Sequence, residues 1–163
     1  MKNDNDEHPL GDKGQISLTV FFLIIWLTDS FWLHWTTILV DTVPLLVRLL
    51  LAVVILTLSI WLILSAHFIV KDESRFDGIA KHGVFRIIRH PLYLGSMLFI
   101  LGLAFATFSL ASFGVFLIIF CFYDFIARYE EKILESKFGD EYKSYKENTG
   151  KWLPRLTKKK ERE

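Results

Sequence analysis

The sequence lacks several patterns that mark common functional classes. It has a single cysteine, Cys121, in an apolar run, so internal disulfides are excluded and we expect a small buried hydrophobic residue there. It has no GxGxxG motif after a strand and no Walker loop, and therefore indicates neither common nucleotide-binding fold. Its histidines do not repeat at a four-residue spacing and have no cysteines near them, so we expect no metal site.

Charge is also scarce over most of the chain. Residues 16–70 contain only three acidic or basic side chains, and residues 92–126 contain only Asp124. Hydrophobic residues make up 52% of the sequence, which is hard to keep in water unless much of the apolar surface faces lipid. We therefore predict an all-α, polytopic integral membrane protein with about four transmembrane helices. The net charge of +1 says little about partners, and we expect no nucleic acid among them.

Four apolar segments carry this prediction: residues 16–33, 44–66, 92–108 and 110–127. The second segment has 23 residues, which at ~1.5 Å each span ~34 Å and cross a bilayer. Arg48 is close enough to the near interface to reach it with its side chain. The third segment is barely long enough to span, and Gly95 and Gly102 allow another helix to approach it closely. The short break at Ser109 predicts an antiparallel helical hairpin.

The far end of the first segment combines aromatic and ionisable residues. We interpret Trp32 and Trp35 as an aromatic belt at the lipid–water interface. Asp29 lies deeper, where an ionisable residue usually faces a bundle interior or a water-filled cavity. A structural cap, a partner of His34 and a substrate contact all remain open for Asp29.

The ends of the chain differ in composition from the apolar segments. We expect a flexible leader at 1–15, a single membrane domain at 16–156 and a charged tail at 157–163. The connection between the second and third segments has five Lys and Arg residues, the part after Ala127 has eleven, and the connection between the first two segments has none. Because positively charged loops stay in the cytoplasm, we predict a cytoplasmic C-terminal helical arm, with both polar stretches and both termini on that side.

The first polar stretch is KHGVFRIIRHPLYLG at 81–95. Gly83 allows the backbone to approach a ligand closely, and Pro91 can begin a helix, which places His90 at its N-terminal edge. The free N–H groups and partial positive charge of a helix start favour a carboxylate, a phosphate or the acceptors of a nucleotide-like ligand. A basic loop that touches lipid headgroups is an equally good interpretation of these residues.

The second polar stretch is ARYEEKILESKFGDEYKSY at 127–145. We expect the fourth helix to continue through it to Gly139 and a short helix to follow. Arg128 lies on one helical face with Glu131, whereas Glu130 points about a hundred degrees away. We therefore expect only one of these glutamates to face a given site. The alternative is a solvated charged helix with internal ion pairs, such as Asp124 with Arg128.

Both stretches resemble a known family. The segments HGVFRIIRHPLYLG at 82–95 and RYEEKILESKFGDEYKSY at 128–145, followed by WLP at 152–154, are similar to the isoprenylcysteine carboxyl methyltransferases and to related integral-membrane phospholipid methyltransferases. The resemblance covers roughly the C-terminal half, and the combination in this order is more specific than the RHPxY motif alone. The first two apolar segments match only as generic membrane helices.

The resemblance implies transfer of a methyl group from S-adenosyl-L-methionine without a Rossmann domain. It implies a lipid-borne or hydrophobic acceptor in the bilayer, such as a prenylcysteine carboxylate or a phospholipid amine. By the same resemblance, the cofactor is held by Phe85, His90, Pro91, Leu92 and Tyr93, and less directly by Ile79 and Ala80. The catalytic positions correspond to Arg128 and Glu130, with Glu131 as the alternative to Glu130. Family members often have tyrosine at the position of Phe85, so a hydroxyl contact is absent there.

Two other functions stay open at this point. Membrane sterol reductases resemble the same family but use a nicotinamide cofactor, and the run Arg-Tyr-Glu-Glu at 128–131 favours the methyltransferase over them. A non-catalytic membrane protein whose basic faces bind anionic lipid is the third possibility. The acceptor itself is open among a prenylated cysteine, an ethanolamine lipid, a small thiol and an isoprenoid acid.

Overall fold

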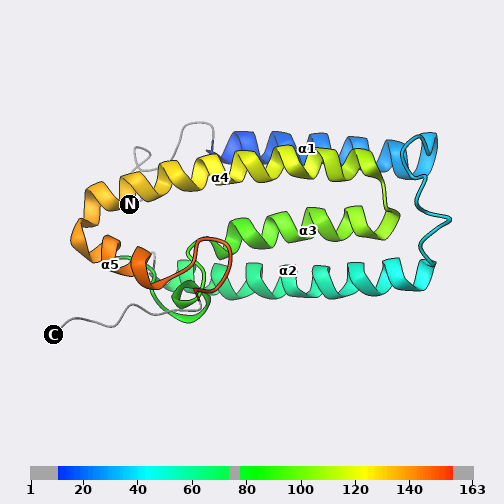
Figure 1. The fold of residues 1–163 in the computed structure, drawn as a ribbon. Coiled ribbons are helices and arrows are strands. Elements are labelled where there is room, and N and C mark those ends of the chain that lie inside the picture. Colours follow the sequence, from blue (N-terminus) through cyan, green and yellow to red (C-terminus); the bar gives the residue numbers. More distant parts are fainter. Residues whose placement is uncertain (1–10, 74–77, 156–163) are drawn as a thin grey trace.

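The computed structural model describes residues 11–73 and 78–155, and within them the chain is helical (Figure 1). Most of the predicted leader and the whole of the predicted tail lie outside these residues. The elements in chain order are α1 (Gly11–Thr28), η1 (Asp29–Leu33), α2 (Leu45–Glu73), η2 (Gly83–Arg86), α3 (Pro91–Thr107), α4 (Leu110–Phe138) and α5 (Asp140–Asn148). The described part has no strand, only an isolated parallel bridge between Ile88 and Gly150. The all-α prediction is confirmed.

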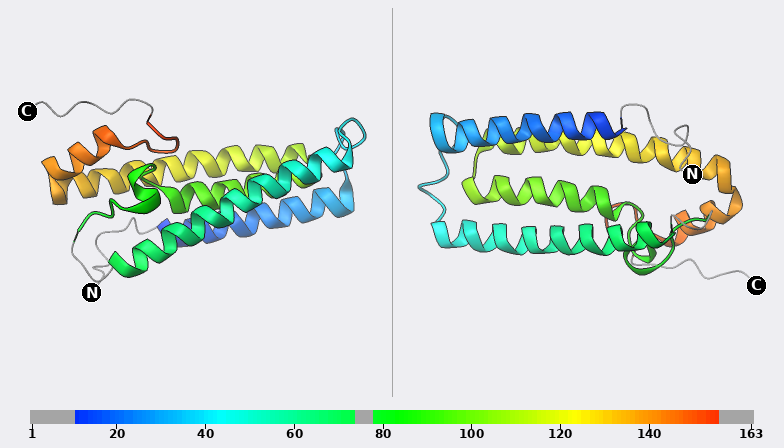
Figure 2. Two further views of the ribbon diagram at one scale, coloured as in Figure 1. Left: turned by 90° about the horizontal axis from the view of Figure 1, so that it is seen from below. Right: turned by 180° about the vertical axis from the view of Figure 1, so that it is seen from behind.

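The helices α1 to α4 run along one common direction, with α1 beside α4 and α3 between that pair and α2 (Figures 1 and 2). Two glycines of α3 allow α2 to pack closely against it. A Cβ atom at Gly95 would lie 2.6 Å from the side chain of Ile63, and one at Gly102 would lie 2.8 Å from Leu56. Ser59 also donates a hydrogen bond of 2.7 Å to the carbonyl of Gly95. The predicted close approach at these glycines is confirmed.

Three of the helical stretches are long and apolar enough to cross a membrane: Lys13–Leu33, Leu45–Lys71 and Leu110–Phe138. Their outer faces are apolar and exposed, as lipid contact requires; Leu46, Val54 and Leu117 are each more than 60% exposed. The single cysteine belongs to this surface, because Cys121 is exposed. The expectation that Cys121 is buried is therefore wrong: its helix turns this face away from the bundle core.

The α3 helix is the short one, and it does not start level with its neighbours. Its 17 residues measure ~25 Å, whereas the 29 residues of α2 measure ~43 Å. The end of α3 is level with the connection between α1 and α2, since the N–H of Leu110 donates to the carbonyl of Thr36 at 3.1 Å. Its start at Pro91 therefore lies inside the bundle, set back from the ends of α2 and α4.

Asp29 joins the end of α1 to the turn between α3 and α4. Its carboxylate accepts hydrogen bonds from the hydroxyls of Thr36 and Ser109, each at 2.6 Å, and from the Thr36 N–H at 3.0 Å. Asp29 is 6% exposed, so it faces the bundle interior as the sequence predicts. The partners are hydroxyls and a backbone amide, which makes Asp29 a structural tie between segments.

Candidate functional site

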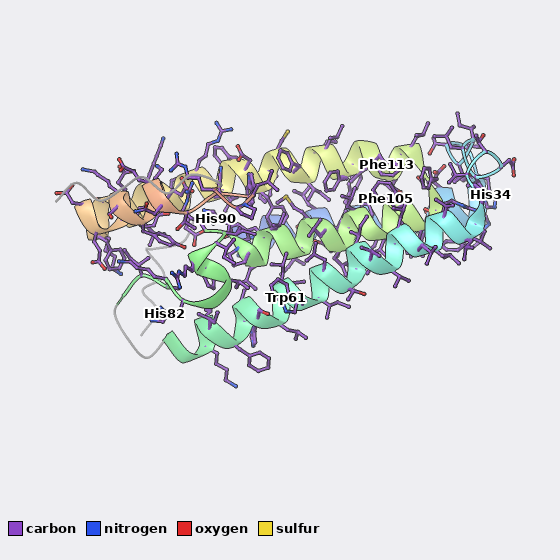
Figure 3. The ribbon with its side chains drawn as sticks, turned by 60° about the horizontal axis from the view of Figure 1, so that its bottom comes forward. His34, Trp61, His82, His90, Phe105 and Phe113 are labelled. Carbon is purple, nitrogen blue, oxygen red and sulfur yellow. The ribbon has the colours of Figure 1, made fainter. Side chains whose placement is uncertain are left out.

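The two polar stretches meet at the end of the bundle where α3 begins (Figure 3). The loop before α3 turns through η2, and Gly83 has φ +52° there, a left-handed conformation that favours glycine. Pro91 is the first residue of α3, and the proline needs no partner for an N–H at that position. His90 stands directly before it, as predicted from the sequence. The chain therefore presents the imidazole of His90 at a helix start.

A buried carboxylate from α4 connects the two residues before Pro91. Oε1 of Glu131 accepts a hydrogen bond from Nε of Arg89 at 2.9 Å and lies 3.2 Å from Nε2 of His90. The Glu131 and Arg89 side chains are 7% and 9% exposed, so the pair is shielded from solvent. Such shielding strengthens each contact and makes the loss of any one partner costly.

Glu130 approaches the same imidazole from the other side. Its Oε2 lies 3.7 Å from Nδ1 of His90, and its side chain is 41% exposed. The expectation that only one glutamate faces the site is therefore wrong, because His90 lies between the two directions in which Glu130 and Glu131 point. One carboxylate is fixed by buried partners, while the other remains accessible from outside.

The segment 149–155, which we call the C-terminal strap, packs against the residues before α3. The Arg89 N–H donates to the carbonyl of Gly150 at 2.9 Å, and Nη1 of Arg89 donates to the carbonyl of Thr149. The short helix α5 is tied to the same loop, since the hydroxyl of Tyr145 donates to the carbonyl of Phe85 at 2.6 Å. Arg89 thus holds α4, through Glu131, and the C-terminal strap at one place.

Aromatic rings surround the imidazole. The ring of Tyr93 is parallel to that of His90, with centroids 5.6 Å apart and an angle of 2° between planes. Trp152, from the C-terminal strap, lies 5.7 Å from the same imidazole. Tyr123 of α4 meets Tyr93 edge to face at 5.3 Å. The site therefore combines π-faces with carboxylates, a combination that suits a cationic ligand.

Asp124 fixes the position of Trp152. Its Oδ1 accepts a hydrogen bond from the indole N–H of Trp152 at 3.1 Å and also contacts the ammonium group of Lys151. The other carboxylate oxygen accepts from Nε of Arg128 at 2.7 Å. This lone charge of the fourth apolar segment therefore has a structural purpose: it ties the C-terminal strap to α4.

The predicted site residues fall into separate groups. His90 and Tyr93, with Glu130 and Glu131, come together in one cluster. Arg128 does not join it: its side chain is 72% exposed and pairs with Asp124, which lies one helical turn before Arg128. Four other predicted cofactor residues have apolar side chains. Phe85 and Leu92 pack against Leu62 and Ala66 of α2, and Ile79 and Ala80 are partly buried. The fifth, Pro91, is fully buried.

Three contributors were missed as site residues from sequence. Arg89 immediately precedes the His-Pro pair, and its position between isoleucine and histidine was a usable signal. Asp124 is the lone charged residue in a long apolar run, which by itself indicates a structural or functional tie in a membrane helix. Trp152 was noted only as part of the closing WLP, and no periodic pattern places that segment against His90.

A polar pocket of about 550 Å³ lies beside the cluster. It is shared by Arg89, α5, the end of α4 and the C-terminal strap, and its lining residues are Arg89, Glu135, Lys143, Lys146, Glu147, Thr149, Gly150, Lys151 and Arg155. None of the predicted cofactor residues lines it. Arg89 therefore has its carboxylate partner on one side and this basic pocket on the other.

Tyr142 is the buried side chain of α5. It is 1% exposed, and burial raises the pKa of its hydroxyl above the ordinary tyrosine value, with the charge of Glu131 acting in the same direction. Tyr142 therefore stays neutral across the physiological pH range. Among the described residues, no group of three or more His, Cys, Asp and Glu side chains is arranged to hold a metal ion.

This geometry defines a class of protein. It is a polytopic helical membrane protein in which a histidine and two glutamates gather at the start of a short helix. The sequence model of the phospholipid methyltransferase family matches residues 45–141, more than half of the chain. The chain belongs to this family, and the matched region contains His90 and both glutamates.

Two curated proteins are similar to parts of the chain. One is protein-S-isoprenylcysteine O-methyltransferase A of Arabidopsis thaliana, 29% identical over 89 residues, which are 54% of this chain and 45% of the plant protein. The other is an uncharacterized protein of Haemophilus influenzae, 49% identical over 45 residues, which are 28% of this chain and 71% of that protein. The chain thus spans less than half the length of the plant relative. No solved structure matches it.

Proposed function

We propose that the protein transfers a methyl group from S-adenosyl-L-methionine to a lipid-borne acceptor, such as a prenylcysteine carboxylate or a phospholipid amine. The observation that carries this proposal is the cluster around His90. There, a buried Arg89–Glu131 pair, a second accessible carboxylate and parallel aromatic rings meet at the start of a membrane helix. The family membership and the similarity to a plant O-methyltransferase support the same reaction.

The residues around His90 fit the proposed cofactor in chemical type. S-adenosyl-L-methionine supplies its methyl group from a sulfonium, a cation that aromatic faces and carboxylates stabilise. Tyr93 and Trp152 provide the faces, and Glu130 provides the accessible carboxylate. Basic side chains of the neighbouring pocket suit an anionic group at the other end of a ligand. We assign to Glu131 and Arg89 the role of holding His90 in place.

The recessed start of α3 supports an acceptor that comes from the bilayer. Because α3 is shorter than α2 and α4 and is level with them at its other end, His90 lies deeper than the ends of those helices. A hydrophobic acceptor can then reach the cluster without leaving the lipid. A water-soluble cofactor approaches from the α5 side.

The acceptor determines what His90 and Glu130 need to do. A carboxylate acceptor is already a nucleophile, so these residues need only position it. An amine acceptor must lose a proton first, and His90 or Glu130 can accept it. The two groups lie 3.7 Å apart, so a proton taken by one can be stabilised by the other. We expect the pH dependence of the rate to distinguish these cases: only an amine acceptor requires a group that must be deprotonated on the enzyme.

The test is incubation of the purified protein with labelled S-adenosyl-L-methionine and a total lipid extract, followed by identification of the labelled product. We expect His90→Ala and Tyr93→Ala to weaken cofactor binding by at least tenfold, or about 1.4 kcal/mol. His67→Ala serves as the matched control, because His67 is an exposed histidine of α2 outside the cluster. Stabilisation by NADPH in place of S-adenosyl-L-methionine would instead favour the reductase. Absence of both effects in folded protein would contradict the proposal.

A further inference from the structure

The first six residues of α2 have an unusual burial pattern. Five apolar residues there are 44–69% exposed, namely Leu45, Leu46, Val47, Leu49 and Leu50. Arg48, in their midst, is 8% exposed. The arginine lies on the same helical stripe as Ala52 and Ser59, which face α3 and are 3% and 0% exposed. At this end of the bundle the apolar side chains face lipid while the cation is buried.

The guanidinium of Arg48 is incompletely compensated. Its Nε is the buried side-chain polar atom that has no hydrogen-bond partner in residues 11–73 and 78–155. An arginine keeps its charge in a protein, and a buried charge without a partner is strongly unfavourable. The start of α2 makes this worse, because the partial positive charge of a helix N-terminus repels a cation. An anion from outside the chain would remove both penalties.

The carboxylates at this end do not supply that anion. Asp29 is saturated by hydroxyl and amide donors from Thr36 and Ser109. Asp41 is exposed, and the described part of the chain forms no ion pair with it. The compensating group must therefore come from the surroundings of this helix start, which are lipid on the side of the exposed leucines.

The position of Arg48 corresponds to the depth of lipid phosphates. It is the fourth residue of α2, ~4.5 Å along the axis from the helix start at Leu45. Side chains of a helix tilt toward its N-terminus, so the guanidinium is directed to the nearby membrane surface. A guanidinium also matches the geometry of a phosphate through parallel N–H donors.

We propose that Arg48 binds the phosphate of a membrane phospholipid in the leaflet at the 34–44 end of the molecule. The exposed side chains of Leu45 and Leu49 provide an apolar surface for its acyl chains. This lipid is separate from the proposed acceptor, since Arg48 belongs to the start of α2 and His90 precedes the start of α3, and these two helix starts lie toward opposite ends of the bundle (Figure 1). Its role is to neutralise the buried cation and to hold α2 against α3.

The test compares wild type, Arg48→Met and Arg48→Gln in lipid-free detergent and after addition of phosphatidylglycerol. Without lipid we expect Arg48→Met to be at least as thermostable as wild type, because it removes an uncompensated charge. Added phosphatidylglycerol should raise the wild-type Tm by roughly 5–10 °C at saturation and should have little effect on either variant. Native mass spectrometry should show a phospholipid retained by wild type and lost from Arg48→Gln.

Lys132→Gln is the charge-matched control, because Lys132 is an exposed cation of α4, next to Glu131 at the other end, and does not line the basic pocket. It should respond to phosphatidylglycerol like the wild type. Equal lipid retention and equal Tm shifts for the wild type and the Arg48 variants would overturn the proposal. So would an equal Tm shift with inorganic phosphate alone or with a phosphate-free galactolipid. A wild-type protein that is dimeric, with a monomeric Arg48→Gln variant, would indicate that a second copy of the chain supplies the anion. That result would also overturn the proposal.

Discussion

Glu131 is the residue on which the geometry of the cluster depends most. Its side chain is 7% exposed and contacts Arg89 and His90 through one oxygen, while Lys146 lies 3.5 Å from the other. Substitution by glutamine keeps the shape but removes the charge that offsets the buried guanidinium. We expect Glu131→Gln to lower the free energy of unfolding by about 3 kcal/mol. Thermal unfolding in detergent with added phospholipid measures this loss.

Glu135→Gln provides the control for that change. Glu135 lies one helical turn further along α4 and pairs with Lys146 at 3.3 Å, but its side chain is 36% exposed. Pairs with that much solvent access contribute little, so we expect a loss below about 1 kcal/mol. Equal losses of unfolding free energy in Glu131→Gln and Glu135→Gln would show that the burial of Glu131 does not add to its contribution to stability.

Trp152 tests whether the C-terminal strap forms a wall of the site. Phenylalanine at this position keeps an aromatic face near His90 but loses the hydrogen bond to Asp124. We expect Trp152→Phe to bind S-adenosyl-L-methionine within about threefold of wild type and Trp152→Ala to bind at least tenfold more weakly, about 1.4 kcal/mol. Calorimetric titration measures both constants. Unchanged binding of S-adenosyl-L-methionine by Trp152→Ala would show that the indole does not contribute to the site.

Individual side chains were only partly predictable from the sequence. The His-Pro pair and the run of glutamates were both predicted as site residues, and the structure brings them into one cluster. A proline fixes a helix start, and consecutive residues of one helix stay close together. Arg128 was assigned a role by resemblance, yet an aspartate one turn earlier holds it outside the cluster. Which cation pairs with Glu131 depends on how α4 packs against the loop before α3, and local spacing carries no information about that.

Among the elements, the helices were predictable and the C-terminal strap was not. Pro91 begins α3 and Gly139, with φ +54°, ends α4, as their conformational preferences require. The C-terminal strap has no hydrophobic period, and its position follows from long-range bonds such as that between the Arg89 N–H and the Gly150 carbonyl. Such contacts join residues far apart in the sequence and leave no local pattern.

The C-terminal strap contains a tight turn at Gly150. A Cβ atom at Gly150 would lie 1.6 Å from the carbonyl oxygen of Leu153, a backbone atom that cannot move without opening the turn. We expect Gly150→Ala to detach the C-terminal strap, with at least tenfold faster hydrogen exchange of its amides, about 1.4 kcal/mol of local stability. Hydrogen exchange with mass spectrometry measures the effect in folded protein.

Gly114→Ala is the matched glycine control. Gly114 lies within α4, and a Cβ atom there would meet nothing within 4 Å. Alanine favours a helix over glycine by up to about 1 kcal/mol, so this variant should be as stable as the wild type or slightly more stable. If both alanine variants left exchange in the C-terminal strap unchanged, the tight turn at Gly150 would not be what holds that segment.

At the scale of the whole molecule, the two ends of the bundle differ in chemistry. One end carries His90, the glutamates and the basic pocket, and the other carries the Asp29 tie and the exposed Trp32 and Trp35. The sequence predicted this asymmetry because lysines and arginines gather on one side of each apolar segment. It predicted about four membrane helices, and three are long enough to cross alone. The sequence shows that α3 is short, but only the packing shows that its start, with His90, is set back from the ends of α2 and α4.

This arrangement predicts a membrane topology that labelling can measure. In a Cys121→Ser background, Asp41→Cys places a thiol in the 34–44 connection and Ser144→Cys places one in α5, and both positions are exposed. The two segments lie at opposite ends of the bundle (Figure 1). Since basic loops stay in the cytoplasm, an impermeant maleimide should label Asp41→Cys in intact cells and Ser144→Cys only in inverted vesicles. Labelling of both thiols from one side would mean that the helices do not cross the bilayer as a bundle. The reverse sidedness would keep the bundle but move the proposed site to the outer face, away from a cytoplasmic supply of S-adenosyl-L-methionine.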